Sequence, residues 1–242
     1  MQENLKPSVY FYILAVFFLF YLYREGYFEN IISISKEVLS KNIKLGFFLA
    51  LGIIVLITGF DHSTAVLMKN NPSTFADQIT KIANILGKGD LFIYPFVSIC
   101  FFIALLLKKE YYIKVFAVCA SSTVFAGILI QFIKIAFARA RPRISDSPLS
   151  FFNYNQIFNM ENTLESDFLS FASGDTITIT ALFVPLIYFI KNKFLRVVFI
   201  VPIVIVCFGR LYSTSHWLSD VSAGLILGVT IGVVFSKNKD IP

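Results

Sequence analysis

Residues 197–235 read VVFIVPIVIVCF, then GRLYSTSHWLSD, then VSAGLILGVTIGVVF. Two apolar stretches that approach the ~17–20 residues needed to cross a bilayer as a helix flank one short polar run. The run holds Arg210, His216 and Asp220, in a chain with only two histidines. Ionisable side chains are costly at the edge of hydrocarbon, so their presence there favours a function. The stretch therefore predicts a membrane fold with a site at the membrane surface.

The composition of the whole chain also indicates a membrane fold. Hydrophobic residues make up 57% of the 242 residues and charged residues 15%, and the mean hydropathy is +0.74. A soluble domain has about 45–50% apolar and about 25% charged residues. The sequence does not alternate with the polar-in, apolar-out period of a membrane barrel. We predict an all-α, polytopic membrane helical bundle.

Six apolar stretches are predicted to form the core transmembrane helices, preceded by an N-terminal hydrophobic helix. The six are residues 45–60, 91–107, 115–133, 176–190, 197–212 and 218–235. The N-terminal stretch, residues 9–23, is rich in Phe and Tyr and lacks a small-x-small cleavage site, so we expect it to be retained, either as a tilted span or at the interface. The predicted organisation is an N-terminal hydrophobic or interfacial segment (1–44), a membrane domain (45–235) and a cytoplasmic tail (236–242).

Basic residues gather in the connectors that alternating spans place on one side of the membrane. These residues are Lys36, Lys41, Lys44, Lys108, Lys109, Lys114, Lys191, Lys193, Arg196, Lys237 and Lys239. The positive-inside rule makes that side cytoplasmic. Three polar clusters, at residues 134–142, 173–175 and 210–220, then share the opposite face. Residues 61–90, with His62 as a solvated interfacial residue, and the loop 144–167, with Phe151, Phe152, Tyr154 and Phe158, are predicted to lie on that face too.

The third cluster has the residue types of an oriented nucleophile or base. If a helix opens at Ser215, His216 and Asp220 stand at i and i+4, within reach of a hydrogen bond that fixes the imidazole tautomer. Arg210 is a permanently charged, forked donor suited to phosphate or carboxylate. The structural alternative is an interfacial histidine paired with Asp220 and an arginine that anchors a helix end.

The first two clusters suit an anion. Lys134 and Arg141 are seven residues apart, about two helical turns, and can share a helix face around one tetrahedral anion if the helix continues to Pro142. Ser173 and Gly174 precede a helix, whose free amides and dipole favour an anion, although such a pair is also a common helix cap. Snorkelling at a helix end is the alternative for basic residues, and we expect it for Arg139 and Arg143. Phosphate binding accounts for all three clusters together.

The three clusters resemble the signature of the type 2 phosphatidic acid phosphatase superfamily over residues 45–235. The matching residues are Lys134, Arg141 and Pro142, then Ser173, Gly174 and Asp175, then Arg210, His216 and Asp220. The resemblance implies a metal-independent phosphatase without a cofactor, with six core transmembrane helices and a site that faces the periplasm or another non-cytosolic space. It also implies that His216 attacks phosphorus and Asp220 orients it, while Lys134, Arg141, Ser173, Gly174 and Arg210 hold the phosphoryl oxygens.

The middle motif departs from that signature, which usually reads Pro-Ser-Gly-His. Ala172 and Asp175 replace its proline and its acid-donating histidine, and Gly209 replaces the serine usual before the arginine. An aspartate is a general acid only where its surroundings favour the protonated form, and adjacent cations oppose that. A Ser/Cys-Gly-Asp motif is similar to that of bacterial lipid A 4'-phosphatases.

The leading hypothesis is a bacterial inner-membrane lipid phosphatase that works on the periplasmic side through a phosphohistidine, with lipid A preferred and lipopolysaccharide modification as its role. Alternatives are an undecaprenyl diphosphate or phosphatidylglycerol phosphate phosphatase, a lipid phosphotransferase, or a non-catalytic lipid-phosphate binding or transport protein. The expected partners are a lipid phosphate and the bilayer, without nucleic acid.

Cys100, Cys119 and Cys207 lie in apolar runs without ligand spacing and are predicted to be packing residues, so neither a metal site nor a disulfide is expected. The oligomeric state is left open.

Overall fold

A computed structural model describes residues 40–152 and 165–237, together with residues 16, 17, 20, 23, 24, 33, 34 and 36. Across these residues the chain is helical, apart from connecting turns and one isolated β-bridge between Arg139 and Phe151. The predicted all-α bundle is confirmed. Most of the N-terminal segment, the loop residues Tyr154 and Phe158, and residues 238–242 lie outside the described part of the chain.

Eleven helical elements follow one another in the described residues. They are α3 (Ile43–Val55), the π-helix η1 (Leu56–Phe60), α4 (Asp61–Asn70), α5 (Thr74–Gly87), the π-helix η2 (Gly89–Ile93), α6 (Tyr94–Leu106), α7 (Glu110–Phe137), the 3-10 helix η3 (Glu165–Phe168), α9 (Gly174–Phe189), α10 (Lys193–Tyr212) and α11 (Leu218–Ser236). Within the same residues, five helical stretches are long and apolar enough to cross a membrane: Lys44–Asn70, Gly89–Leu106, Glu110–Phe137, Lys193–Tyr212 and Leu218–Ser236. The chain is a multi-pass membrane protein.

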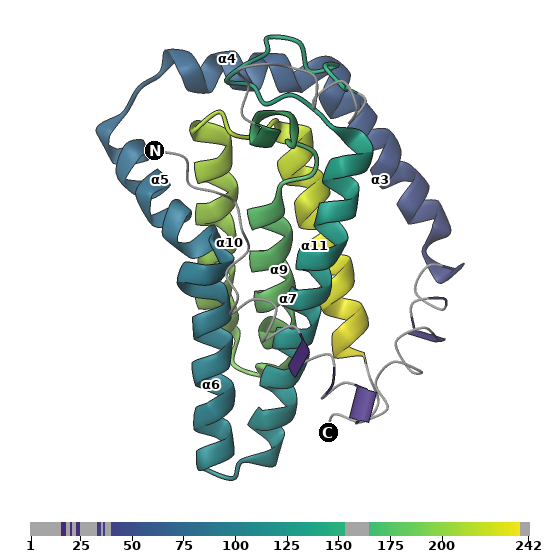
Figure 1. The fold of residues 1–242 in the computed structure, drawn as a ribbon, viewed down its shortest axis with the longest axis vertical. Coiled ribbons are helices and arrows are strands. Elements are labelled where there is room, and N and C mark those ends of the chain that lie inside the picture. The colour runs from purple at the N-terminus through teal and green to yellow at the C-terminus, as the bar shows by residue number, and fades with distance from the viewer. Residues whose placement is uncertain are drawn as a thin grey trace.

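The remaining predicted span, α9, has 16 residues and lies at the centre of the bundle. It contacts α7, α10 and α11, and its residues 176–183 are all buried. At 1.5 Å per residue it is about 24 Å long, shorter than a typical span. Figure 1 shows why: α9 begins deeper in the bundle than the ends of α10 and α11 beside it, after a loop that dips inward.

A stripe of glycines brings α11 against α9. A Cβ atom on Gly224 would lie 2.8 Å from the carbonyl oxygen of Ser173, and one on Gly228 would lie 2.6 Å from the Cβ atom of Thr180. Small residues at every fourth position let two membrane helices approach closely. The stripe therefore holds the beginning of α9 beside the beginning of α11, where the second and third polar clusters lie.

Residues 61–90, predicted as an outer connector, form two helices that belong to the bundle. The helical stretch Lys44–Asn70 continues past the predicted end at Phe60, and its last part, α4, lies across the end of the bundle (Figure 1). The next helix, α5, packs along α10. The contact is close because Gly209 of α10 faces Ala83, and a Cβ atom at Gly209 would lie 2.3 Å from that of Ala83.

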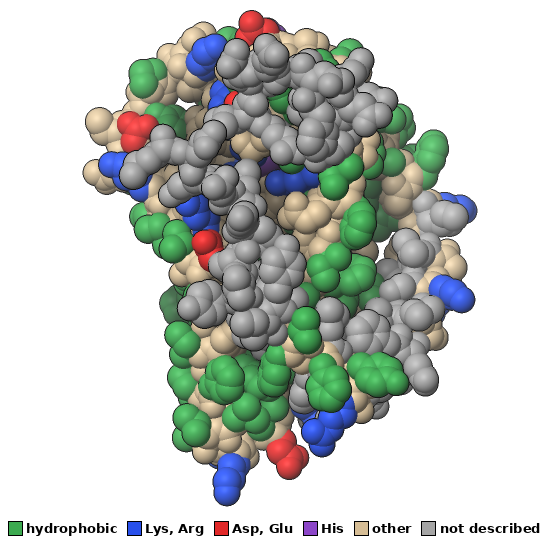
Figure 2. Space-filling view, in the orientation of Figure 1, with side chains coloured by type: hydrophobic (Ala, Val, Ile, Leu, Met, Phe, Trp, Pro, Cys, Tyr) green, Lys and Arg blue, Asp and Glu red, His purple; other side chains and the backbone are tan. Residues whose placement is uncertain are grey.

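The outer surface of the bundle is apolar between its two ends. In Figure 2, exposed hydrophobic side chains gather over the lower half of the bundle, and lysine and acidic side chains lie at its lower end. Leu106, Phe132 and Val204 are each more than half exposed, as expected of side chains that face lipid. The α6–α7 and α9–α10 turns, which carry Lys108 and Lys191, lie at the end opposite α4 (Figure 1).

Candidate active site

The three polar clusters meet at the end of the bundle covered by α4. The backbone amide of Ser173 donates to the carbonyl oxygen of Asp220 at 3.1 Å, which joins the second cluster to the third. Oδ2 of Asp175 lies 3.0 Å from Nη1 of Arg210. The ammonium nitrogen of Lys134 lies 3.3 Å from the position of a Cβ atom on Gly174, which joins the first cluster to the second. Residues that are 35 to 47 positions apart in the sequence therefore share one site.

The imidazole of His216 is buried and bound through Nδ1. Its exposed fraction is 5%, and Nδ1 lies 2.8 Å from the carbonyl oxygen of Ser170. A carbonyl only accepts, so we assign the proton to Nδ1 and a free lone pair to Nε2. The nitrogen that the site leaves unprotonated is therefore Nε2.

The expected hydrogen bond between His216 and Asp220 is not formed. Nδ1 lies 3.8 Å from Oδ2 of Asp220, within ion-pair range but beyond a hydrogen bond. The prediction assumed a helix from Ser215, whereas α11 begins at Leu218. His216 precedes the helix, so the i to i+4 geometry does not apply, and the carbonyl of Ser170 fixes the tautomer instead.

Burial is the main reason why the pKa of His216 is lowered to about 4. The cationic side chains of Arg141 and Lys134 lower this pKa further, and Asp220 opposes them. Burial in a low dielectric disfavours the charged imidazolium, as do nearby cations. At neutral pH the ring is therefore uncharged and Nε2 can act as a nucleophile.

The carboxylate of Asp220 is fully buried and held by three donors. Oδ2 accepts from the backbone amide of Trp217 at 2.9 Å and from Oγ of Ser170 at 2.5 Å. Oδ1 accepts from Nη1 of Arg139 at 2.5 Å. Sequence reasoning missed Ser170, because a serine three residues before the Ser173-Gly174 pair carries no distinguishing pattern.

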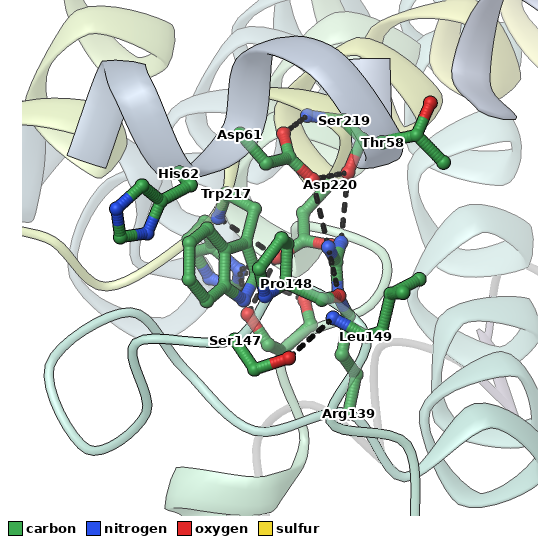
Figure 3. Close-up of polar contacts among 12 residues, drawn as sticks. Thr58, Asp61, His62, Arg139, Ser147, Pro148, Leu149, Trp217, Ser219 and Asp220 are labelled. Carbon is green, nitrogen blue, oxygen red and sulfur yellow. Dashed lines mark hydrogen bonds and ion pairs between the residues drawn. The ribbon is translucent and has the colours of Figure 1, made fainter. Parts of the chain in front are cut away.

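The prediction that Arg139 snorkels to the surface is wrong, because its side chain is completely buried. Nη2 donates to Oδ2 of Asp61 at 2.7 Å, so the guanidinium pairs with Asp61 as well as with Asp220 (Figure 3). The turn after α7 explains why the Arg139 side chain points into the protein. Ala138 has a left-handed backbone with φ of 40°, which ends the helix just before Arg139. Arg143 is exposed, as expected of a surface residue, and pairs with Asp167.

Lys134 and Arg141 supply positive charge at the first cluster. Nε of Arg141 donates to the carbonyl oxygen of Ser166 at 2.9 Å, and burial followed by the charge of Arg143 lowers the pKa of Arg141 to about 10. Its guanidinium remains charged at neutral pH. The ammonium of Lys134 makes no hydrogen bond or ion pair within the described residues, so it is available to an anion.

Ser173 and Gly174 stand at the beginning of α9, as predicted from the sequence. The hydroxyl of Ser173 accepts from Oγ1 of Thr176 at 2.9 Å, and its amide is already bound to Asp220. The next amides, at Gly174 and Asp175, have no partner within α9 because they belong to its first turn. These two amides, beside the Lys134 ammonium, form the helix end that suits a phosphoryl oxygen.

Arg210 is held between α9 and α5. Besides its ion pair with Asp175, Nη2 donates to Oδ1 of Asn84 at 2.6 Å. Nε of Arg210 is buried and has no hydrogen-bond partner in the described residues, so one donor of this guanidinium remains free for a ligand. Asn84 was also missed by sequence reasoning, which treated residues 61–90 as a connector.

The remaining candidates lie apart from the site. His62 is exposed, and its Nδ1 lies 2.9 Å from the carbonyl oxygen of Asp146. Cys100, Cys119 and Cys207 are free and sit inside helices, with Cys119 buried.

The fold and the site together define a multi-pass helical membrane protein with a buried neutral histidine among arginines and a lysine. The model of the PAP2 superfamily matches residues 111–240, more than half of the chain. The chain belongs to the PAP2 superfamily, and this membership with the apolar helices fits a membrane lipid phosphatase. The matched range contains all three polar clusters, whereas Asp61 and Asn84 lie before it. Searches of curated proteins and of solved structures found no match.

Proposed function

We propose that the protein hydrolyses a phosphate monoester of a membrane lipid through a phosphohistidine at His216. The observation that carries this proposal is the state of the imidazole: it is buried and uncharged, and its Nδ1 proton is held by the carbonyl of Ser170, so the lone pair is on Nε2. A nucleophile has to be oriented and unprotonated before it attacks. Both conditions are met in this site.

In the first step Nε2 attacks phosphorus and the bond to the lipid oxygen breaks, which leaves the phosphoryl group on His216. The lipid alcohol leaves with a proton taken from a water molecule, which becomes hydroxide. In the second step this hydroxide attacks the phosphohistidine and the P–N bond breaks, which releases hydrogen phosphate and restores the neutral imidazole. Phosphoryl transfer depends mainly on positioning and on stabilising the charge of the equatorial oxygens.

The phosphoryl oxygens are proposed to bind three cationic side chains and one helix end. Lys134 has a free ammonium, Arg210 has a free Nε and Arg141 keeps its charge. The amides of Gly174 and Asp175 add donors from the first turn of α9, behind the Ser173 cap. Asp220 stays 3.8 Å from the imidazole and offsets the positive charge that His216 gains when it carries a phosphoryl group.

Asp175, expected to be catalytic, is proposed to be a positioning residue that acts through Arg210. Oδ2 of its carboxylate lies 3.0 Å from Nη1 of Arg210. A carboxylate engaged in this ion pair orients the guanidinium. Asp175 therefore sets the position of Arg210 for the phosphoryl group, and water supplies the proton to the leaving alcohol.

Lipid A is the preferred substrate, with the inner membrane as location and the periplasm as the compartment that the site faces. The Asp175 variant of the middle motif supports this choice, as does a groove beside the site. The groove is lined by His62, Ala65, Val66, Lys69, Asn70, Pro142, Ser145, Asp146, Thr214 and Trp217. Lys69 and the polar side chains of Asn70 and Ser145 give this groove groups that can bind a sugar phosphate headgroup.

The experiment is a phosphate-release assay with purified protein in a chelating buffer. The substrates are lipid A, phosphatidic acid, phosphatidylglycerol phosphate and undecaprenyl diphosphate, and mass spectrometry of the products separates hydrolysis from transfer to another lipid. We expect release from lipid A that His216→Ala abolishes and Asp77→Asn retains, because Asp77 is an exposed carboxylate of α5 outside the site. Lipid binding without phosphate release would instead support a binding or transport protein, and full activity of His216→Ala would contradict the mechanism.

A further inference from the structure

Asp61 and Arg139 form a completely buried ion pair directly behind the carboxylate of Asp220 (Figure 3). Asp61 is the first residue of α4, and Arg139 follows the end of α7. A buried charge without a partner is strongly destabilising, so each of these charges depends on the others. Asp61 lies before the range that the PAP2 model matches, so the family signature says nothing about it.

The donors of Arg139 are directed at acceptors on three segments of the chain. Nη1 donates to Asp220 at 2.5 Å and to Oγ of Ser219 at 2.7 Å. Nη2 donates to Asp61 at 2.7 Å and to the carbonyl oxygen of Pro148 at 2.6 Å, and Nε donates to the same carbonyl at 3.0 Å. A guanidinium has five N–H groups in a rigid fork. All five are used, so Arg139 cannot turn without losing Asp220.

Asp61 also binds the beginning of α11 directly. Its Oδ1 accepts from the backbone amide of Ser219 at 2.8 Å, and its Oδ2 accepts from Oγ of Ser219 at 2.5 Å. A carboxylate at the N-terminus of a helix is favoured by the helix dipole. Asp61 therefore fixes α4 to the turn of α11 that carries Asp220.

The charges of this group add to one negative charge, from Asp61, Arg139 and Asp220. Without Asp61, Arg139 would cancel the charge of Asp220. A net negative charge behind the imidazole favours the cationic form of His216 that attack on phosphorus produces. The carboxylate of Asp61 thus lets Asp220 favour the cationic form of His216 even though Arg139 binds Asp220.

We infer that Asp61 is a positioning residue for the reaction at His216, acting through Arg139 and Asp220, and that α4 is part of the catalytic apparatus. The expected effect of Asp61 on kcat rests on the proposed function. The expected effect of Asp61 on the pKa of the His216 imidazole does not, because it depends only on the arrangement of charges.

The first test compares Asp61→Asn with wild type in the phosphate-release assay. The asparagine keeps the size of the side chain and an acceptor for Ser219 but removes the charge. We expect kcat to fall about 10- to 100-fold, as for other groups that orient a reacting residue from behind, with KM changed much less because no contact to the lipid is lost. Asp77→Asn removes an exposed carboxylate from α5 and should leave both constants unchanged. An unchanged kcat for Asp61→Asn overturns the inference.

The second test reads His216 without turnover. In a His62→Gln background His216 is the one imidazole of the chain, and ¹⁵N NMR follows its titration. The charged groups that act on its pKa are Asp220, Arg141 and Lys134, Arg139 binds Asp220, and all four are retained in Asp61→Asn. We expect a lower imidazole pKa in Asp61→Asn than in its parent, since a negative charge has been removed. An unchanged pKa overturns the inference.

The two tests separate the two proposals. If wild type releases no phosphate but Asp61→Asn lowers the imidazole pKa, the proposed function fails and the positioning role stands. If Asp61→Asn does not fold, Ser219→Ala replaces it, because that variant keeps every charge and removes one link between Asp61 and Arg139. It should lower kcat at an unchanged KM, and an unchanged kcat would overturn the inference.

Discussion

Asp175 Oδ2 lies 3.0 Å from Nη1 of Arg210, at the position where the family signature usually has a histidine. The pair has room because residue 87 of α5 is glycine: a Cβ atom there would lie 2.9 Å from the Cβ atom of Asp175. The replacement of the histidine is therefore accompanied by a matching space on the neighbouring helix. Asp175, Arg210 and α5 form one arrangement.

Asp175→Asn should reduce kcat/KM by a similar factor, about 10- to 100-fold, for an alkyl phosphate such as lipid A and for an aryl phosphate. The physical reason is that a residue that orients Arg210 affects binding of the phosphoryl group whatever the leaving group is. An aryl oxide leaves without protonation, so a general acid matters only for the alkyl ester. A loss confined to the alkyl substrate would assign Asp175 the role of proton donor.

Gly209→Ser, which restores the residue usual in the family, should destabilise the protein by about 1–3 kcal/mol through overpacking. The Cβ atom it introduces would lie 2.3 Å from that of Ala83. The double variant Gly209→Ser/Ala83→Gly should recover part of the loss, although glycine in a helix itself costs about 1 kcal/mol. Thermal unfolding in detergent measures both. Equal melting temperatures for Gly209→Ser and wild type would contradict the close contact of α5 and α10.

Stability should fall as the pH decreases from about 6.5 to about 4. The pKa of His216 is about 4 in the folded protein, whereas an unfolded histidine titrates near 6.5, so in this window the unfolded chain binds a proton that the folded chain does not. The contribution of the neutral His216 ring to stability is complete above the pKa of the unfolded histidine, and it is lost as the pH falls below that value. Near pH 5 the loss should be on the order of 2 kcal/mol. Comparing the melting temperatures of wild type and His216→Gln near pH 7.5 and pH 5 isolates it, and equal losses would argue against the buried neutral ring.

Ser170→Ala should lower kcat about tenfold and leave KM nearly unchanged. The hydroxyl donates to Asp220 at 2.5 Å, and its removal leaves a buried carboxylate oxygen with one donor fewer. The carbonyl of Ser170 remains, so the bond to Nδ1 of His216 is retained. Ser236→Ala is the matched control, because Ser236 is a buried serine at the other end of α11. Equal kinetics for both variants would mean that the Ser170 hydroxyl has no part in the site.

The sequence predicted the helical class, five of the six spans and the meeting of three clusters, because apolar runs and basic connectors are local signals. It did not predict α4 and α5 as parts of the site. Asp61 and Asn84 look like ordinary polar residues of a connector, and their partners Arg139 and Arg210 are 78 and 126 residues away. The inward direction of the Arg139 side chain depends on the left-handed backbone of Ala138, which no sequence motif predicts. The bond between His216 and Asp220 was mispredicted because helix starts are uncertain by a few residues, and a shift from Ser215 to Leu218 changes which groups face the ring.

The most direct measurement of the central claim is rapid-quench trapping of a phosphoenzyme from substrate labelled with ³²P at the phosphate. A phosphohistidine is labile to acid and stable to base, unlike a phosphoserine. We expect label on wild type with that stability, located on the peptide that contains His216, and none on His216→Ala. Turnover of the lipid without a trapped histidine adduct, or an adduct that persists in His216→Ala, would contradict the account.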